Sequence, residues 1–117
     1  KAAEGFMQTA FPYDMTMKDM NDQAKAFTEA WKKNFPNKAP NVNATLGYTC
    51  YDMIIEALKR AGKADREAVT KALAETKGLA TPVGIMTLNA NHDAEIPVGI
   101  LKYENGKRIY LGEIVPE

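Results

Sequence analysis

The sequence has little of what catalysis or a disulfide-held fold requires. Its 117 residues include one cysteine, Cys50, and one histidine, His92. A single cysteine excludes an intrachain disulfide and any zinc site built from several cysteines. His92 has no serine or cysteine close to it in the sequence that would complete a catalytic relay, and both common phosphate-binding glycine patterns are missing. The sequence therefore predicts that the chain is not an enzyme and holds no cofactor.

The chain also lacks an excess of charge of either sign and a long hydrophobic run. The 15 Lys and Arg residues balance the 15 Asp and Glu residues. A neutral total removes the broad attraction that draws proteins to nucleic acids or anionic membranes, so we expect no nucleic-acid partner. No apolar run approaches the roughly 20 residues of a membrane-spanning helix. The segment Lys1–Glu4 has no initiator Met and no apolar signal core, so we expect any targeting signal to precede Lys1.

The composition is that of one ordinary folded unit. Hydrophobic residues make up 45% of the chain and charged residues 26%, which is typical of globular proteins and is enough for a single core. Residues 19–78 show helical periodicity and residues 83–115 show strand periodicity. Between them these two patterns account for most of the chain.

Three amphipathic helices are expected in residues 19–78. The first runs from about Asp19 to Phe35, with Asp19 or Asn21 as its cap, and carries an apolar stripe that we expect in the core. The second runs from about Ala44 to Ala61 and ends at Gly62. The third follows Asp65 and ends near Thr76. The stripe of the first helix consists of Ala24, Phe27, Trp31 and Phe35, and that of the second includes Leu46, Cys50, Ala57 and Leu58.

Strands are expected at both ends of the chain. Residues 5–11 read as a strand with no β neighbour for seventy residues, so we expect its sheet partners to lie outside this chain. Residues 83–88, 98–103 and 108–115 are expected to form one antiparallel layer against the helices, which gives an α+β arrangement. Asn105-Gly106 predicts a two-residue type I′ hairpin between the last two strands.

The polar segment Asn89–Glu95 places oxygen-bearing side chains at alternate positions, as the start of a calcium loop does. The rest of that motif is missing, because Ala94 stands where glycine is required and Ile100 where a bidentate glutamate is required. We therefore interpret the segment as a polar loop and predict no metal site.

The aromatic residues fall into two groups. Phe27, Trp31 and Phe35 share a helical stripe, which favours the core, whereas Phe11, Tyr13 and Tyr48 lie where a strand ends or a helix begins. Such chain connections are where small-ligand pockets form. For each of these residues, core packing remains the alternative.

The order of the segments resembles a known family. The chain is similar to the C-terminal third of the type I periplasmic solute-binding proteins of ABC transporters, the branched-chain amino-acid (Leu/Ile/Val-binding) family. The segments that carry the resemblance are Glu4-Gly5-Phe6, Phe11-Pro12-Tyr13-Asp14, Ala26-Phe27, Trp31-Lys32-Lys33, Leu46-Gly47-Tyr48-x-x-Tyr51, Ala57 to Gly62, Val69 to Leu73, Gly84 to Asn89, and Gly106-Lys107 to Pro116.

This resemblance implies an α/β periplasmic-binding-protein-like fold with two lobes that close on a ligand by hinge motion. Residues 1–117 would form a single partial domain of it, with a strand in 1–11, a hinge-like connection in 12–18, helices in 19–78 and strands in 83–115. The segments that hold the ammonium and carboxylate of an amino acid would lie upstream of this chain. Many relatives have Gly-Tyr-Asp where this chain has Gly47-Tyr48-Thr49.

The same resemblance implies that four positions line the side-chain end of the ligand pocket: Phe11, Tyr13, Leu46 and Tyr48. It further implies an extracytoplasmic, periplasmic location and a role in capturing an amino acid or a related small carboxylate or amide for a membrane permease. Because a part of a larger fold leaves apolar surface and strand edges open, we also expect self-association. The alternative function is a small α+β interaction module that dimerises through its β edge without binding a ligand.

Overall fold

Within residues 3–14 and 17–116, which the computed structural model describes, the chain forms three helices and six short strands. This confirms the α+β arrangement with antiparallel pairing. The two described parts of the hinge-like connection, 12–14 and 17–18, contain neither helix nor strand, and residues 15–16 lie outside the description. In chain order the elements are β1 (Met7–Ala10), α1 (Asp22–Asn34), α2 (Val42–Ala61), α3 (Arg66–Ala74), β2 (Leu79–Thr81), β3 (Gly84–Leu88), β4 (Ala94–Glu95), β5 (Val98–Glu104) and β6 (Lys107–Ile114).

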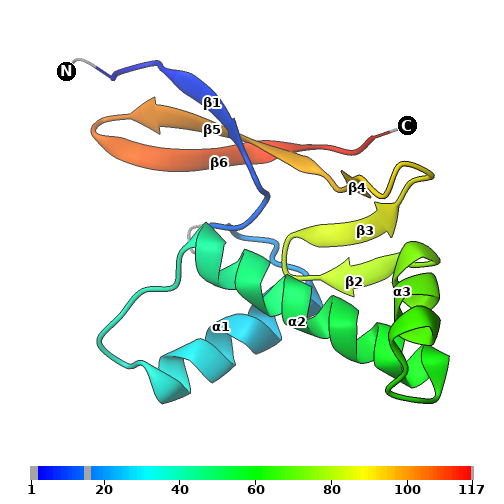
Figure 1. Cartoon of the computed structure of the whole chain (residues 1–117). Helices are drawn as coiled ribbons and strands as arrows, with labels where there is room; N and C mark the ends of the chain where they lie inside the picture. The colour runs from blue at the N-terminus through cyan, green and yellow to red at the C-terminus, as the bar shows by residue number, and fades with distance from the viewer. Residues whose placement is uncertain (1–2, 15–16, 117) are drawn as a thin grey trace.

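These elements are arranged in two bodies, one above the other in Figure 1. The upper sheet has the strand order β1-β5-β6, and the helical body combines the three helices with a second sheet of order β2-β3-β4. The radius of gyration is 16.3 Å, whereas a compact chain of this length would have about 13 Å. The molecule is therefore extended along the line that joins the two bodies.

Each helix begins directly after a side chain that caps it, and α2 begins at Val42, two residues before the expected start. Asn21, Asn41 and Asp65 accept hydrogen bonds from the backbone amides of Ala24, Ala44 and Ala68 at 2.8, 3.0 and 3.0 Å. These bonds satisfy amides that have no partner inside the helix. Because Asn21 is the cap, α1 begins three residues later than the earliest start that the sequence allowed.

The hairpin between β5 and β6 is as predicted. Glu104 pairs with Lys107 across the turn, and Asn105 and Gly106 have φ angles of 53° and 71°. Both angles are positive, as a type I′ turn requires. This turn sets the register of the longest strand pair in the upper sheet.

Two expectations about the strands are wrong. β1 does have a partner in this chain, because it pairs antiparallel with β5 from Met7↔Lys102 to Ala10↔Gly99. β3 does not join the layer of β5 and β6; it pairs with β2 and β4 in the other sheet. The pairing of β1 with β5 joins residues about ninety positions apart, so it has no local sequence signal. The pairing of β3 depends on the short strand β2, which the sequence did not indicate.

The core lies in the helical body. Tyr13, Ala24, Phe27 and Val83 form a buried cluster. Phe27 is at its centre, with ring centroids 5.7 Å from Tyr13, 5.8 Å from Trp31 and 5.4 Å from Tyr48. Phe35 and Cys50, which the sequence placed on inward stripes, are both exposed. The apolar pattern of α1 and α2 therefore extends beyond the surface that this core uses.

Phe27→Ala is expected to destabilise the chain by about 3–5 kcal/mol, because it removes a buried ring that touches three others and leaves a cavity. Urea unfolding followed by circular dichroism measures the change. Phe35→Ala is the matched control, since Phe35 lies on the same helix and is 47% exposed, and it should cost less than about 1 kcal/mol. Equal losses for the two variants would contradict this description of the core.

Candidate functional site

Two segments of the chain connect the upper sheet to the helical body. The first crossing contains Pro12, after β1, and the second contains Pro97, before β5. Each crossing passes close to a glycine. A Cβ on Gly99 would lie 2.9 Å from Cε2 of Tyr110 and 3.2 Å from the Cα of Pro12. A Cβ on Gly84 would lie 2.9 Å from Cγ of Pro97, and the φ of Gly84 is 109°. At each crossing, therefore, a proline packs where only a glycine leaves room. These two contacts fix how the bodies meet.

An ion pair reinforces the first crossing. The guanidinium of Arg108, on β6, lies 2.5 Å from Oδ2 of Asp14, whose side chain is only 5% exposed. The backbone amide of Asp14 also contacts Sδ of Met17 at 3.3 Å. A buried carboxylate needs such a partner, because an uncompensated charge in the interior is costly. Arg108 thereby ties the upper sheet to the chain that enters the helical body.

Tyr13 follows this crossing and is built into the core. It is 5% exposed, and its hydroxyl lies 2.9 Å from Oγ1 of Thr28. Thr28 donates its own hydroxyl hydrogen to the carbonyl of Ala24 at 2.7 Å, which leaves Tyr13 as the donor in their shared bond. The bond fixes the ring edge-on against Phe27.

Tyr48 lies beside the same cluster and is partly exposed to solvent. It is 36% exposed and lines a groove of about 400 Å³ between α1 and α2. Burial, followed by the negative charge of the neighbouring Asp52, raises the pKa of the Tyr48 phenol. Burial and the charge of Glu56 likewise raise the pKa of Asp52. The other residues that line the groove are Phe27, Ala30, Trp31, Asn34, Phe35 and Ala44.

The four residues expected to line a ligand pocket are therefore only partly brought together. Tyr13, Tyr48 and the half-buried Leu46 gather around the cluster of Phe27. Phe11 is 41% exposed and lies apart from them, in a small depression of about 290 Å³ with Thr9, Ala10 and Val98. Neither the groove nor this depression is lined by all four.

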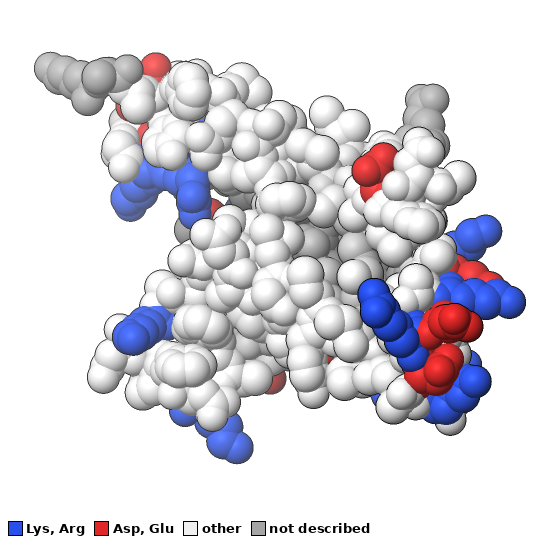
Figure 2. Space-filling view, viewed as in Figure 1, with Lys and Arg blue, Asp and Glu red and all other residues white. Residues whose placement is uncertain are grey.

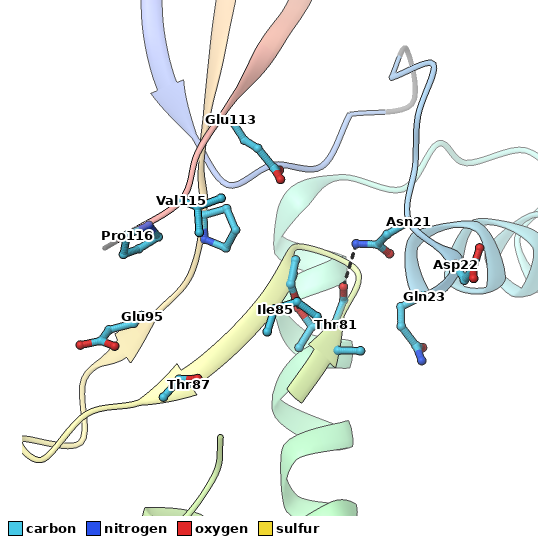
Figure 3. Close-up of a pocket in the computed structure, with 13 residues that line it drawn as sticks. Asn21, Asp22, Gln23, Thr81, Ile85, Thr87, Glu95, Glu113, Val115 and Pro116 are labelled. Carbon is cyan, nitrogen blue, oxygen red and sulfur yellow. Dashed lines mark hydrogen bonds between the residues drawn. The ribbon is translucent and has the colours of Figure 1, made fainter. Parts of the chain in front are cut away.

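A larger cavity, which the sequence gave no signal for, lies where the two bodies meet (Figure 3). Its volume is about 640 Å³, within the range of small-molecule sites. Asn21 closes one wall by donating from Nδ2 to the carbonyl of Thr81 at 3.1 Å. The cavity is lined by the start of α1, by β2 and β3, by Glu95 and Pro97, and by Glu113, Val115 and Pro116 from the end of the chain.

The acidic side chains of this cavity are Asp22, Glu95 and Glu113. Tyr110 donates its hydroxyl to Oε2 of Glu113 at 3.3 Å. Burial, together with that carboxylate, raises the pKa of Tyr110 to about 12. Since the lining combines side chains from both bodies, any change in their relative angle changes this cavity.

The loop that resembles the start of a calcium site is a turn held by its own side chains. Oδ1 of Asn89 accepts the backbone amides of Asn91 and Asp93 at 2.9 and 3.0 Å. No group of three His, Cys, Asp or Glu side chains suited to a metal ion occurs in the part of the chain that the structure describes. Within the same residues, no helix has both the length and the hydrophobicity to cross a bilayer.

Comparison with known families and curated proteins gives consistent matches. A family model described as periplasmic binding protein matches residues 1–108. A Leu/Ile/Val-binding protein homologue of Brucella melitensis is 35% identical over 94 residues, which are 78% of this chain and 25% of that protein. The chain therefore spans about a quarter of the length of this relative.

Solved structures give the same picture. A leucine binding protein of Thermotoga maritima matches 99% of this chain and 32% of its own length, with a TM-score of 0.81 and 30% identity. A solute binding protein of an ABC transporter from Rhodopseudomonas palustris, in complex with 3,4-dihydroxybenzoic acid, matches 97% of this chain and 32% of its own, with a TM-score of 0.78 and 27% identity. All three are described as binding proteins, and the Rhodopseudomonas palustris protein as the solute binding protein of an ABC transporter.

Gly99→Ala is expected to destabilise the chain by about 1–3 kcal/mol, because the new methyl meets the backbone of Pro12, which cannot move away as a flexible side chain can. Gly47→Ala is the matched control. A Cβ on Gly47, within α2, has no atom within 4 Å, so this change should be stabilising by about 0.5–1 kcal/mol. Urea midpoints measure both, and a neutral Gly99→Ala would mean that the crossing is not closely packed.

Proposed function

The chain belongs to the periplasmic binding protein family, and from that premise we propose that it forms part of the solute-binding component of an ABC transporter. This component captures an amino acid or a related small carboxylate or amide outside the cytoplasm and delivers it to a membrane permease. The observation that carries the proposal is the family match over residues 1–108 in a chain built as two bodies joined by two narrow crossings. Two bodies joined in this way suit closure around a ligand by hinge motion.

In this proposal the aromatic residues near the crossings face the apolar part of the ligand. Tyr48 and Phe11 are partly exposed and contact the ligand directly. Tyr13 and Leu46 lie one layer deeper and hold the wall in place through the cluster of Phe27. Tyr13 is 5% exposed within the core of the helical body, so its role in this proposal is to support the wall and not to touch the ligand.

The hinge lies in the crossings at Pro12 and Pro97. Proline restricts its own backbone, so rotation there is confined to the flanking residues. The ion pair of Arg108 with Asp14 connects the two bodies at the first crossing. It stabilises the relative orientation of the bodies in which these two side chains are in contact.

Ligand capture can be tested with a chimera of the Thermotoga maritima leucine binding protein in which this chain replaces the matched third. Calorimetry with leucine, isoleucine and benzoate should detect binding, and Tyr48→Ala should weaken it at least about tenfold, or about 1.4 kcal/mol. Tyr48→Phe is the control, because it keeps the ring and loses only the hydroxyl near Asp52.

The isolated 117-residue chain should bind the same compounds weakly or not at all, because the groups that hold ammonium and carboxylate are expected upstream of it. A folded chimera that binds none of the compounds would overturn the proposed function. Micromolar binding by the isolated chain would show that the ligand groups lie within residues 1–117.

A second candidate, the interaction module that dimerises through a strand edge, is favoured by one observation. In the order β1-β5-β6, the strands β1 and β6 each have one side without a strand partner among the described residues. Such edges pair readily with an identical edge.

Self-association of the isolated chain can be measured by light scattering at low micromolar concentration. A dimer that is lost when Thr9→Pro removes a backbone donor from the open side of β1 would favour the interaction module. Thr70→Pro is the control. It lies within α3, so it destabilises the chain without changing a strand edge. A monomer at all concentrations would exclude the module.

A further inference from the structure

The turn between β5 and β6 contains the one Asn-Gly step of the sequence. The chain has eight asparagines, and only Asn105 is followed by a glycine. Asn105 and Gly106 are both exposed. The space beside Gly106 is open, because a Cβ built there would have no atom within 4 Å. The peptide bond between the two residues is therefore accessible to water.

An asparagine that precedes a glycine can lose its side-chain amide by reaction with its own backbone, and asparagine is among the chemically labile residues. The backbone nitrogen of Gly106 attacks Cγ of Asn105, so that a nitrogen–Cγ bond forms and the bond from Cγ to Nδ2 breaks. Nδ2 leaves as ammonia and takes with it the hydrogen of the Gly106 amide. Water then opens the five-membered imide at one of its two carbonyls, which gives aspartate or isoaspartate. Glycine favours the first step because it has no Cβ to obstruct the approach.

The closed turn holds this reaction back. Asn105 and Gly106 have φ angles of 53° and 71°, in the left-handed region where ψ is about +47°. The imide forms only when the backbone of Asn105 rotates away from this ψ, so that the nitrogen of Gly106 comes next to Cγ. Glu104 and Lys107 are paired across the turn, and this rotation separates them. The reaction therefore requires the turn to open locally.

Glu4 fastens the closed turn to the start of the chain. Both carboxylate oxygens of Glu4 accept the backbone N–H of Asn105 at 3.0 Å. The neighbouring bonds follow directly, since the amide of Gly5 donates to the carbonyl of Tyr103 at 2.8 Å and the amide of Tyr103 donates to the carbonyl of Phe6 at 3.0 Å. A hydrogen bond to a charged acceptor is stronger than one between neutral groups. The bond to Glu4 therefore raises the cost of opening the turn.

A carboxylate at position 105 would have an acidic neighbour. Figure 2 shows charges of both signs at the end of the upper sheet that carries the turn. The ammonium of Lys102 pairs with Glu104 at 2.6 Å, whereas the carboxylate of Glu4 faces the amide of Asn105. Aspartate at position 105 adds a negative charge to the residue that Glu4 holds, and like charges at short range repel each other. Isoaspartate also lengthens the backbone of a two-residue turn.

We propose that Asn105 is a modification site, at which Glu4 slows spontaneous deamidation and at which deamidation, once it has occurred, weakens the attachment of β1 to β5. Among the described strands, β1 pairs with β5 alone, so its position depends on this end of the hairpin. The proposal concerns the turn and not a ligand, so it does not depend on the function proposed above.

The site can be tested by peptide mapping with mass spectrometry after the 117-residue chain has been kept in mildly alkaline buffer. Asn105 should be converted before any other asparagine. Asn91 is the internal control, because it is exposed in the loop before β4 and is followed by His92. Unfolding the chain in urea should speed the conversion of Asn105, because no turn then restrains its backbone.

The role of Glu4 is tested with Glu4→Ala, which removes the acceptor of the Asn105 amide. This variant should deamidate about two- to tenfold faster at Asn105, the factor that one net hydrogen bond is worth. Glu29→Ala is the matched control, because Glu29 is an exposed glutamate on α1, and it should leave the rate unchanged.

The consequence for β1 is tested with Asn105→Asp and amide hydrogen exchange. The peptide that contains Met7–Ala10 should exchange about two- to fivefold faster in this variant, because repulsion of Glu4 promotes local opening. Peptides from α2 should be unaffected. In a Glu4→Gln background, Asn105→Asp should no longer speed the exchange of β1, because the two negative charges no longer meet.

Each part of the proposal has a result that overturns it. A folded chain in which Asn105 reacts no faster than Asn91 would exclude the modification site. Equal rates at Asn105 in the unsubstituted chain and in Glu4→Ala would exclude the role of Glu4, and equal rates in the folded and unfolded chain would exclude any restraint by the turn. Unchanged exchange of β1 in Asn105→Asp would exclude the effect on β1.

Discussion

The close approach of two prolines to two glycines is the constraint on which the rest of the molecule depends. Pro12 lies against Gly99 and Pro97 against Gly84, at distances that leave no room for a side chain. These contacts set the direction in which the chain leaves β1 and enters β5. Tyr13 and Asp14 follow directly after Pro12, so their burial under α1 and their contacts with Thr28 and Arg108 depend on that direction. The cavity between the bodies is bounded by the second crossing.

The sequence predicted those features that are decided within a few residues. The caps Asn21 and Asp65, the end of α2 at Gly62 and the turn at Asn105-Gly106 are local, because each depends on hydrogen bonds or φ angles of adjacent residues. The pairing of β1 with β5 is not local. Whether a strand of four residues finds its partner ninety positions later depends on how the intervening helices fold back, which no short pattern encodes. The family resemblance succeeded because it used the order of segments along the whole chain.

The candidate site also has features that the local sequence predicts and features that depend on distant contacts. Sequence position placed Phe11 and Tyr13 where a strand ends and Leu46 and Tyr48 at the start of a helix; in the structure Phe11 and Tyr13 follow β1, and Leu46 and Tyr48 lie in the first two turns of α2. Depth was not predictable, because it depends on rotation about the helix axis and on which residues cover a side chain. Tyr13 and Leu46 pack in or against the core, Tyr48 lies at its margin, and Phe11 belongs to the upper sheet. The cavity lined by Asn21, Thr81 and Glu113 unites residues from three distant segments and has no sequence signature.

The structure leaves several large apolar side chains exposed. Phe35, Tyr51, Ile54 and Ile85 are all at least 46% exposed, although side chains of this kind gain free energy from burial. Tyr51 and Ile54 lie on α2 and Phe35 borders the groove beside it, whereas Ile85 lies on β3 and lines the larger cavity. Both helices bury one face, α1 through Ala24, Phe27 and Thr28 and α2 through Thr45, Thr49 and Ala57, so the core covers only part of the apolar surface of each helix. This exposed apolar surface accompanies a match to only 32% of the leucine binding protein of Thermotoga maritima, so the related fold has further layers that can cover such surface.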